Sequence, residues 1–366
     1  PARCGDPSVR GARLGFFRHL CTAKSGNAKM IPANDEAKPE DVRPLGGVYL
    51  ATFLAPLSAW LNRDDVTDIL VNKPGEVWVE TLGGGIERHD APDVTSLTLT
   101  RLAAQVARIS RQGISREHPL LAATLPSGER IQIALPPATR AHVALAIRKH
   151  VLTDLSLDDY QKAGVLVPSG GASNVNQTPP DLDALLAAGD ISGFLRGAVA
   201  AKLNIVVSGG TGTGKTTFLN ALLKEVPRHE RLILIEDAPE IRLVHENALG
   251  LVAVKGETGE ARVDVNDLLQ AALRMRPDRI IVGEIRGREA FTFLRAINTG
   301  HPGSVTTLHA DSPELAIEQL ALMALQGGVS LTHADLMAYA RSVVDVVVQL
   351  ERVHGKRQVR SVVRMK

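Results

Sequence analysis

The segment Gly209-Gly-Thr-Gly-Thr-Gly-Lys215-Thr216 has the G-x4-G-K-[ST] spacing of a phosphate-binding loop. Its glycines let successive backbone N–H groups curl around an anion, Lys215 can reach the outer phosphates, and the Thr216 hydroxyl can ligate Mg²⁺. An apolar β run at 204–208 precedes the loop and a helical pattern follows it, which is the context that this motif requires. The sequence therefore predicts a nucleoside triphosphate site. The predicted contacts are Gly209, Gly210, Thr211, Gly212, Thr213, Gly214, Lys215, Thr216 and Thr217.

A cluster of carboxylates follows the next apolar run, residues 232–235. Glu236, Asp237 and Glu240 lie within five residues of one another. Hydrolysis of a phosphoanhydride needs one carboxylate to orient or deprotonate water and another to hold Mg²⁺ through its water ligands. The cluster is therefore a candidate for both roles, and the residue types alone do not divide the roles among the three acids.

Two further polar groups follow apolar runs in this half. The run at 279–283 ends at Glu284, but Gly283 stands where P-loop NTPases usually carry an Asp in the metal shell. For Glu284, a metal-shell role and a base role are both open. His301 and His309 have no cysteine partners and no zinc spacing. Because they bracket the β run at 304–308, which follows the NTPase motifs, we predict that they sense the γ-phosphate.

These side chains need strands whose ends meet at one edge of a sheet. The second half supplies apolar β runs at 204–208, 232–235, 249–254, 279–283 and 304–308. Helical patterns lie between or after most of them, at 215–223, 265–275, 288–297 and 313–325. This alternation predicts an α/β fold with a mainly parallel central sheet.

The first half has a different pattern. We expect a helix over 47–62 with a break at Pro56, two β runs within 68–80 around the turn 72–75, and a helix over 96–110. Further β runs at 121–125, 130–135 and 142–149 complete a smaller α+β domain. The predicted organisation is a leading segment 1–44, an α+β domain 45–150, a Pro- and Gly-rich linker 151–180 and an ATPase-type domain 181–366.

Composition excludes several classes of protein. The 366 residues are 44% hydrophobic, which excludes global disorder, and no apolar stretch approaches the roughly 20 residues that cross a bilayer. Residues 1–29 carry six of the 42 basic and one of the 40 acidic residues, so the remainder has a net charge of −3. That charge and the 3% aromatic content argue against a nucleic-acid surface.

The leading segment differs from the rest of the chain. Both cysteines, Cys4 and Cys21, lie in it, and a body without cysteine favours a cytosolic compartment. Residues 1–29 have no apolar core of the kind that a signal peptide needs. We interpret them as a non-native or disordered extension, with a basic arm at a membrane surface as the alternative.

The four motifs of the second half, in this order, resemble the secretion ATPase superfamily of type II secretion, type IV pili and type IV secretion. The segments 65–80 and 126–137 resemble the VirB-eleven type ATPases of type IV secretion and conjugation. The resemblance covers about 57–350 and implies a RecA-like P-loop core that hydrolyses ATP with Mg²⁺. The four metal-binding cysteines of some pilus and type II relatives are missing here, which favours the type IV reading.

The resemblance also implies an assembly and roles for residues. It implies a homohexameric ring, peripheral at the cytoplasmic face of the inner membrane, that works with inner-membrane proteins and companion ATPases to drive export and pilus assembly. Each nucleotide would lie between the two domains, whose closure the linker would accommodate. By resemblance, Glu240 is the catalytic glutamate, Glu284 the second-strand acid, and His301 and His309 the phosphate sensors. The candidate phosphate-reaching arginines are Arg130, Arg140 and Arg148, of which Arg130 and Arg148 are favoured. Mg²⁺ would be held by Thr216 and, through water, by Glu236 and Glu284.

Three alternatives stay open at this point. Within the superfamily, the chain could be a type II secretion or type IV pilus motor. Outside it, a RecA-like nucleic-acid motor is disfavoured by the slightly acidic body, and we expect no sequence-specific nucleic-acid binding. A scaffold that binds ATP without turnover is disfavoured by the intact set of Lys215, Thr216, Glu240 and Glu284.

Overall fold

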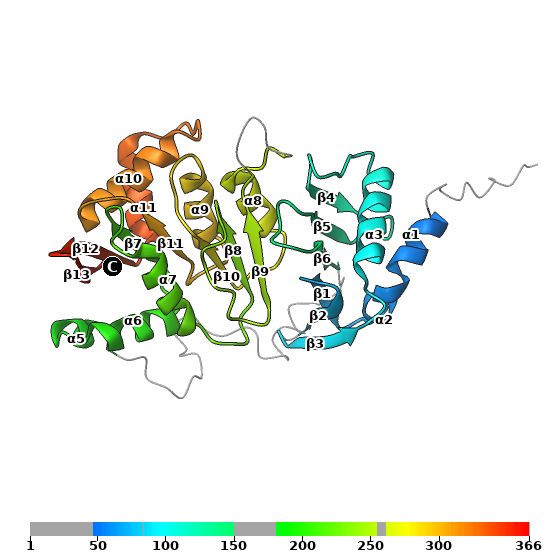
Figure 1. The fold of residues 1–366 in the computed structure, drawn as a ribbon, viewed down its shortest axis with the longest axis horizontal. Helices are drawn as coiled ribbons and strands as arrows, with labels where there is room; N and C mark the ends of the chain where they lie inside the picture. Colours follow the sequence, from blue (N-terminus) through cyan, green and yellow to red (C-terminus); the bar gives the residue numbers. More distant parts are fainter. Residues whose placement is uncertain (1–46, 83, 150–180, 255–260, 366) are drawn as a thin grey trace, which may run out of the picture. The chain divides into compact units, whose positions relative to one another are not determined.

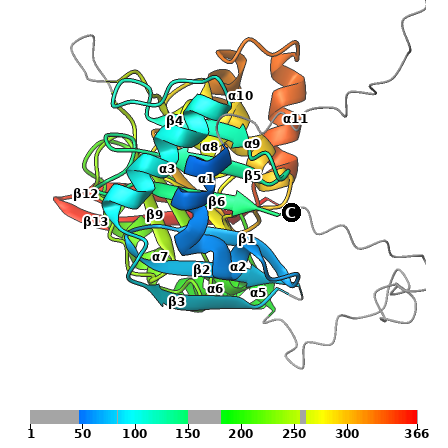
Figure 2. The same ribbon diagram turned by 90° about the vertical axis from the view of Figure 1, so that its right-hand side faces the viewer.

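The computed structural model describes residues 47–82, 84–149, 181–254 and 261–365, which belong to one compact unit, Leu45–Lys366. The predicted segment 1–44, with both cysteines, and the predicted linker 151–180 lie outside the described residues. The described chain contains two sheets with helices packed on them (Figures 1 and 2), which confirms the expected α/β class. The boundaries of the two predicted domains remain a prediction.

The first sheet has six strands in the order β3-β2-β1-β6-β5-β4, and every neighbouring pair is antiparallel. Its strands are β1 (Val66–Val71), β2 (Gly75–Thr81), β3 (Ile86–Ala91), β4 (Leu120–Thr124), β5 (Arg130–Ala134) and β6 (Ala144–Arg148). Its helices are α1 (Gly47–Leu54), a 3-10 turn η1 (Ala55–Leu57), α2 (Ser58–Leu61) and α3 (Ser96–Ile109). The expected break of the first helix at Pro56 is confirmed, since Pro56 lies in the 3-10 turn.

Alternation along the strands gives this sheet two apolar faces. One face, with Ile69, Val79 and Ile133, packs with Leu99 and Leu102 of α3 in a core that belongs to this sheet alone. The opposite face shares a core with the second sheet. Its contribution consists of Leu70, Trp78, Ala134, Ala138, Ala144 and Ala146, of which four are alanines.

The second sheet has seven strands in the order β13-β12-β7-β11-β10-β8-β9. The strands are β7 (Ile205–Gly209), β8 (Leu232–Glu236), β9 (Ala248–Val252), β10 (Arg279–Val282), β11 (Val305–Leu308), β12 (Val346–Val353) and β13 (Lys356–Arg364). Every neighbouring pair is parallel except the edge pair β12–β13. The carboxyl ends of six strands therefore lie at one edge, which we call the carboxyl edge.

Helices cover both faces of this sheet. The helices are α5 (Leu182–Ala187), α6 (Ile191–Ala200), α7 (Lys215–Lys224), α8 (Val265–Ala272), α9 (Glu289–Asn298), α10 (Pro313–Leu325) and α11 (His333–Val343). Apolar residues of α5, α6 and α7 form one core with strand residues such as Val207 and Leu234. Residues of α8 to α11 form the core on the other face with Val206 and Ile235. Figure 1 shows these two groups of helices on either side of the sheet.

We call the contact between the first sheet and the β8–β9 side of the second sheet the seam. Arg231, at the start of β8, is fully buried there and donates to the side-chain oxygens of Asn72 and Asn247, at 2.7 and 2.5 Å. Asn72 also donates to Asn247 at 3.0 Å. Arg276 donates from Nε and Nη2 to the carboxylate of Glu80 of β2, and from Nη1 to Asp278 at 2.6 Å. The seam thus combines small apolar side chains with buried polar bonds.

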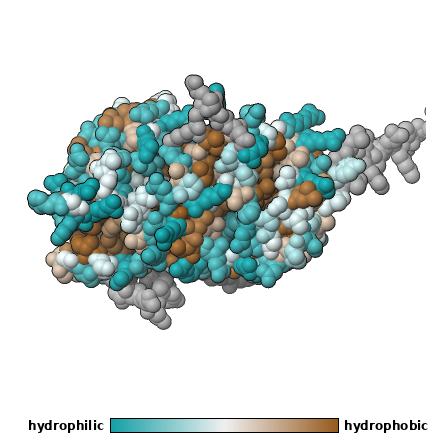
Figure 3. All heavy atoms as spheres, viewed as in Figure 1, coloured by the Kyte–Doolittle hydropathy of each residue, from teal (hydrophilic) through white to brown (hydrophobic). Residues whose placement is uncertain are grey.

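The surface is mixed. On the face drawn in Figure 3, apolar residues form separate patches among hydrophilic ones. The exposed large apolar side chains belong to several different elements: Tyr49, Leu82, Leu97, Leu243, Leu315, Leu322, Leu331 and Val353. Within the described residues, no helix combines the length and the hydropathy that a membrane span requires.

Candidate nucleotide-binding site

The predicted phosphate loop connects the carboxyl end of β7 to the start of α7. All five residues of β7 are buried, so the loop leaves a fixed strand. Gly214 caps α7 in the left-handed region at φ 91°, a conformation that glycine adopts without a steric penalty. The free N–H groups and the positive end of the α7 dipole therefore face the loop, which is the arrangement that binds phosphate.

Lys215 is buried at the first position of α7 and points back over the loop. Its Nζ donates to the Gly209 carbonyl at 2.9 Å and lies 3.3 Å from Nε2 of His309. Burial lowers the pKa of the Lys215 ammonium, and the nearby Glu284 carboxylate works against that shift. The lysine is thus held in place beside the loop by the Gly209 carbonyl and the His309 ring.

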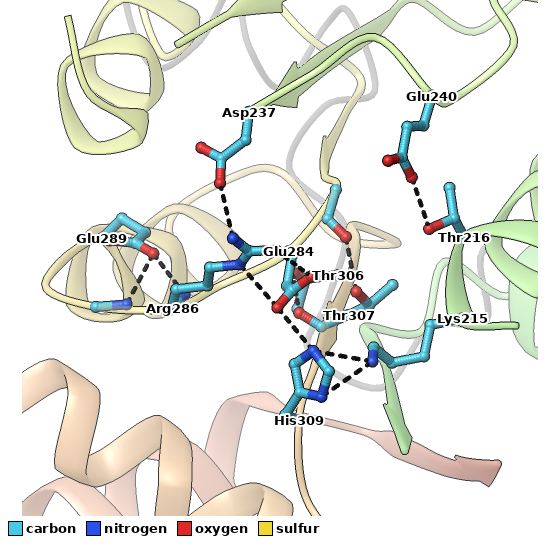
Figure 4. A network of polar contacts seen from close by, with 12 residues as sticks. Lys215, Thr216, Asp237, Glu240, Glu284, Arg286, Glu289, Thr306, Thr307 and His309 are labelled. Atoms are coloured by element: carbon cyan, nitrogen blue, oxygen red, sulfur yellow. Dashed lines mark hydrogen bonds and ion pairs between the residues drawn. The ribbon is translucent and has the colours of Figure 1, made fainter. Parts of the chain in front are cut away.

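A chain of polar contacts runs from Lys215 along the carboxyl edge (Figure 4). His309, after β11, lies 3.1 Å from Glu284, and Arg286 donates to the same carboxylate from Nε and Nη2 at 2.8 and 2.9 Å. Arg286 also pairs with Asp237, after β8, at 3.5 Å. The loops after β7, β8, β10 and β11 are therefore linked by polar contacts. We call these residues the relay.

The other residues of the relay determine the ionisation of the Glu284 carboxyl. Burial alone would raise the pKa of its carboxyl, but the hydrogen bonds and charge of Arg286, aided by His309 and Lys215, lower the pKa below its usual range. Glu284 is consequently an anion at neutral pH, as either of its two predicted roles requires.

Thr216 and Glu240 approach each other on the other side of the loop. The Thr216 hydroxyl donates to Oε2 of Glu240 at 3.2 Å, and the Glu240 side chain is exposed to water. A hydroxyl and carboxylates are oxygen donors of the kind that Mg²⁺ prefers. Within the described residues there is no group of three or more His, Cys, Asp and Glu side chains able to hold a metal by themselves. A bound Mg²⁺ would accordingly depend on Thr216, phosphate oxygens and water.

Glu236 has a different environment from the other acids. It is buried at the last position of β8, where its carboxylate accepts from the backbone N–H groups of Glu240 and Ile241 at 2.9 and 2.7 Å. Arg140, from the loop after β5, donates to the other carboxylate oxygen and to the Ile241 carbonyl at 2.8 Å. Glu236 thus orders the loop that carries Glu240, and Arg140 lies on that loop and not at the phosphate loop.

The two predicted sensor histidines lie at opposite ends of β11 (Val305–Leu308). His309 follows β11 and belongs to the relay. His301 precedes β11, and its Nδ1 lies 3.0 Å from the carbonyl oxygen of Pro277, just before β10. Burial lowers the pKa of His301. Within the described chain, the structure therefore brings His309, but not His301, to the phosphate loop.

Arg130 and Arg148 lie away from the phosphate loop of their own chain. They are directly opposite each other on β5 and β6, and Arg148 donates from Nε to Asp68 at 3.0 Å. Both line a cavity of about 580 Å³ beside Arg274. More than half of the Arg148 side chain is exposed, at 56%, so its outer nitrogens are accessible.

Sequence reasoning missed two members of the relay, Arg286 and Asp237, as site residues. Asp237 was considered only as one acid of the cluster after residues 232–235, and no role was predicted for Arg286. A signal was present for Arg286, since an arginine two residues after a strand-end glutamate can reach back to it. The pairing of Arg286 with Asp237 depends on β8 and β10 being neighbours in the sheet, and this strand order cannot be read from the sequence.

Replacing Lys215 by alanine is expected to reduce ATP turnover by about 10²- to 10³-fold, because a preorganised positive charge beside the transferring phosphoryl group is lost. Steady-state phosphate release at saturating ATP measures this. Lys224→Ala, at the other end of α7, is the matched control and should retain turnover. Turnover of Lys215→Ala within fivefold of the parent would remove the lysine from the reaction.

The chain is similar to known proteins. A model of the type II/IV secretion system protein family matches residues 172–361. The type IV secretion system protein VirB11 of Brucella suis is 41% identical over 329 residues, 88% of this chain and 91% of that protein. PtlH of Bordetella pertussis is 41% identical over 319 residues, 85% and 92% of the two chains.

A solved structure is similar as well. The crystal structure of the VirB11 ATPase from the Brucella suis type IV secretion system in complex with sulphate matches with a TM-score of 0.80 and 38% identity. The match covers 87% of this chain and 95% of that chain. Because the matched 87% of the chain is more than either sheet with its helices occupies, the similarity extends over both sheets.

Proposed function

Because this chain belongs to the type II/IV secretion system protein family and is an ATPase of the type IV secretion kind, we propose that it works as a homohexameric motor. The motor hydrolyses ATP to energise substrate export and pilus assembly, as in conjugative transfer. It acts peripherally at the cytoplasmic face of the inner membrane, with inner-membrane components and companion ATPases. The observation that carries the proposal is the relay, which connects Lys215 to the acids and the histidine of three other strand ends.

Each residue of the site has a chemical task in this proposal. Lys215 neutralises charge that develops on the transferring phosphoryl group, and Glu240 orients and deprotonates the attacking water. His309 exchanges partners between Glu284 and the γ-phosphate, so loss of the γ-phosphate changes the contacts among the relay residues. Mg²⁺, held by Thr216 and through water by Glu284, would polarise the phosphate oxygens.

The arginines of the first sheet supply the reason for a ring. Arg130 and Arg148 lie on one face of the first sheet and line a cavity that does not include the phosphate loop. For either arginine to reach a phosphate, a second protomer or a displacement of the first sheet has to bring it there. We propose that assembly completes the site in this way, and that closure of the first sheet on bound ATP is reversed by hydrolysis.

Turnover per protomer, measured from nanomolar to micromolar protein without DNA, tests the proposal. A site completed by assembly gives a steep rise to a plateau, because the fraction of assembled protomers follows mass action. Native mass at the lowest concentration is measured in parallel. An active monomer would refute the ring motor, whereas an assembled species without turnover would point to a scaffold, and DNA-stimulated turnover to a nucleic-acid motor.

A further inference from the structure

The β12–β13 hairpin extends past the end of β7 and beside the phosphate loop. Leu350 of β12 pairs with Gly209, the last residue of β7. The hairpin continues beyond this pair to a two-residue turn at His354 and Gly355 before β13 returns. Figure 1 shows the hairpin next to β7 and α7, and its end is hydrophilic in Figure 3.

Two arginines of the hairpin come close to glycines of the loop. A methyl group placed on Gly214 would lie 2.9 Å from Cδ of Arg357 and 3.6 Å from its Nε and Nη1. A methyl group on Gly212 would lie 4.0 Å from Nη1 of Arg352. Both guanidinium groups therefore lie beside the same backbone segment that is expected to bind phosphate.

The charges at this place are unbalanced. Arg352 and Arg357 are directly opposite each other on β12 and β13, which is an unfavourable position for like charges. Neither forms an ion pair with the described residues, and the Nε of Arg352 donates only to the Gly355 carbonyl, at 3.4 Å. Lys215 and the positive end of α7 add to the potential. An anion at the loop would relieve the repulsion among these groups.

The strand order decides which part of a nucleotide the hairpin faces. β11 and β10, which carry His309 and Glu284, lie on one side of β7, and β12 and β13 lie on its other side. The relay is on the side assigned above to the γ-phosphate. The hairpin arginines therefore face the other side of the loop, where the phosphates common to ADP and ATP would bind.

We propose that Arg352 and Arg357 form a cationic clamp on the diphosphate part of the bound nucleotide. The proposal rests on the proposed nucleotide site and adds two binding residues to it. Guanidinium groups suit this task because their planar fork matches phosphate oxygens and they stay charged at any physiological pH. The clamp contributes equally to ADP and ATP, so it sets nucleotide affinity and leaves the chemical step to the relay.

The test is nucleotide binding by Arg352→Gln, Arg357→Gln and the double variant of the full chain. We expect the Kd values of ADP and ATP to rise together by about tenfold for each single change, the size expected for a hydrogen bond to a charged group. Arg360→Gln is the matched control, because Arg360 lies on the same strand but pairs with Glu351 at 3.8 Å.

Inorganic tripolyphosphate, used as a competitor, identifies the contact. A phosphate clamp predicts that tripolyphosphate loses the same factor of affinity as ATP. If the variants bound ATP more weakly but tripolyphosphate as tightly as the parent does, the arginines would contact the base or the ribose, and the clamp would be overturned. A double variant that binds ATP and tripolyphosphate as tightly as the parent does would also overturn it. A parent chain that binds neither nucleotide would instead refute the proposed function.

Discussion

The Glu240→Gln variant is expected to lose ATP turnover by about 10²- to 10⁴-fold, the usual contribution of a positioned general base. The carboxylate accepts a hydrogen bond from Thr216 at 3.2 Å and is exposed, so water can reach its other oxygen. Glutamine keeps the shape and accepts hydrogen bonds but cannot take a proton. ATP affinity should therefore change by less than about threefold. Single-turnover kinetics measure the loss of hydrolysis, and equilibrium binding measures the affinity separately.

Glu246→Gln provides the control for this variant. Glu246 is exposed and follows the same strand, but it forms no part of the relay. If Glu240→Gln turned over ATP within about threefold of the parent, the base would have to be sought elsewhere. Glu284 would then be the next candidate, since the charge of Arg286 keeps it ionised.

Replacing Arg148 by alanine is expected to reduce turnover by about 10³-fold, as loss of an arginine that stabilises the transferring phosphoryl group does. ATP binding should remain close to that of the parent, because Lys215 and the loop amides are untouched. Arg101→Ala, an exposed position on α3, controls for charge loss on the same half. Arg148→Lys distinguishes a fork-specific contact from a simple charge.

Mixing two inactive variants shows where the arginine comes from. Arg148→Ala protomers carry an intact Lys215, and Lys215→Ala protomers carry an intact Arg148. If one protomer supplies its arginine to the loop of its neighbour, mixed assemblies regain part of the turnover. Failure to regain turnover, with mixed assembly verified by mass, would mean that both groups act within one chain. Full activity of Arg148→Ala alone would exclude this arginine from the site.

The parallel sheet and its phosphate loop could be predicted because their signals are local. The apolar runs predicted at 204–208, 232–235 and 279–283 have the length of buried strands and match β7, β8 and β10 within one residue, and the glycines and Lys215 occur at fixed spacing. In contrast, β3 was missed since its sequence Ile-Glu-Arg-His-Asp-Ala is mostly polar and only Ala91 is buried. The β12–β13 hairpin and the helices α5, α6 and α11 were also not predicted.

The placement of His301 could have been anticipated from geometry. A strand of four residues is about 13 Å long, at 3.3 Å per residue, so two residues that bracket it are more than that distance apart and lie at opposite ends of the strand. Residues at the two ends of this strand cannot both contact one phosphate within the same chain. A sensing role for His301 therefore remains a prediction that needs a second chain.

The positions of Arg140 and Glu236 could not be predicted from the sequence. Arg140 lies 96 residues before Glu236, and their contact follows from how the first sheet meets β8 and β9. The family resemblance had implied a place at the nucleotide for both residues, Arg140 at the phosphates and Glu236 at the metal. The contact between them depends on tertiary structure, which neither residue type nor spacing encodes.

The composition of the seam has a consequence for motion. Separating it would expose mainly alanines on the first sheet, while the guanidinium of Arg231 and the amides of Asn72 and Asn247 would exchange their mutual bonds for bonds to water. Each sheet would keep a core of its own, around Leu102 in one and Leu219 in the other. Contacts of this composition resemble those between proteins that associate transiently. The closure proposed above therefore requires the two halves to part only across the seam, while each keeps its own core.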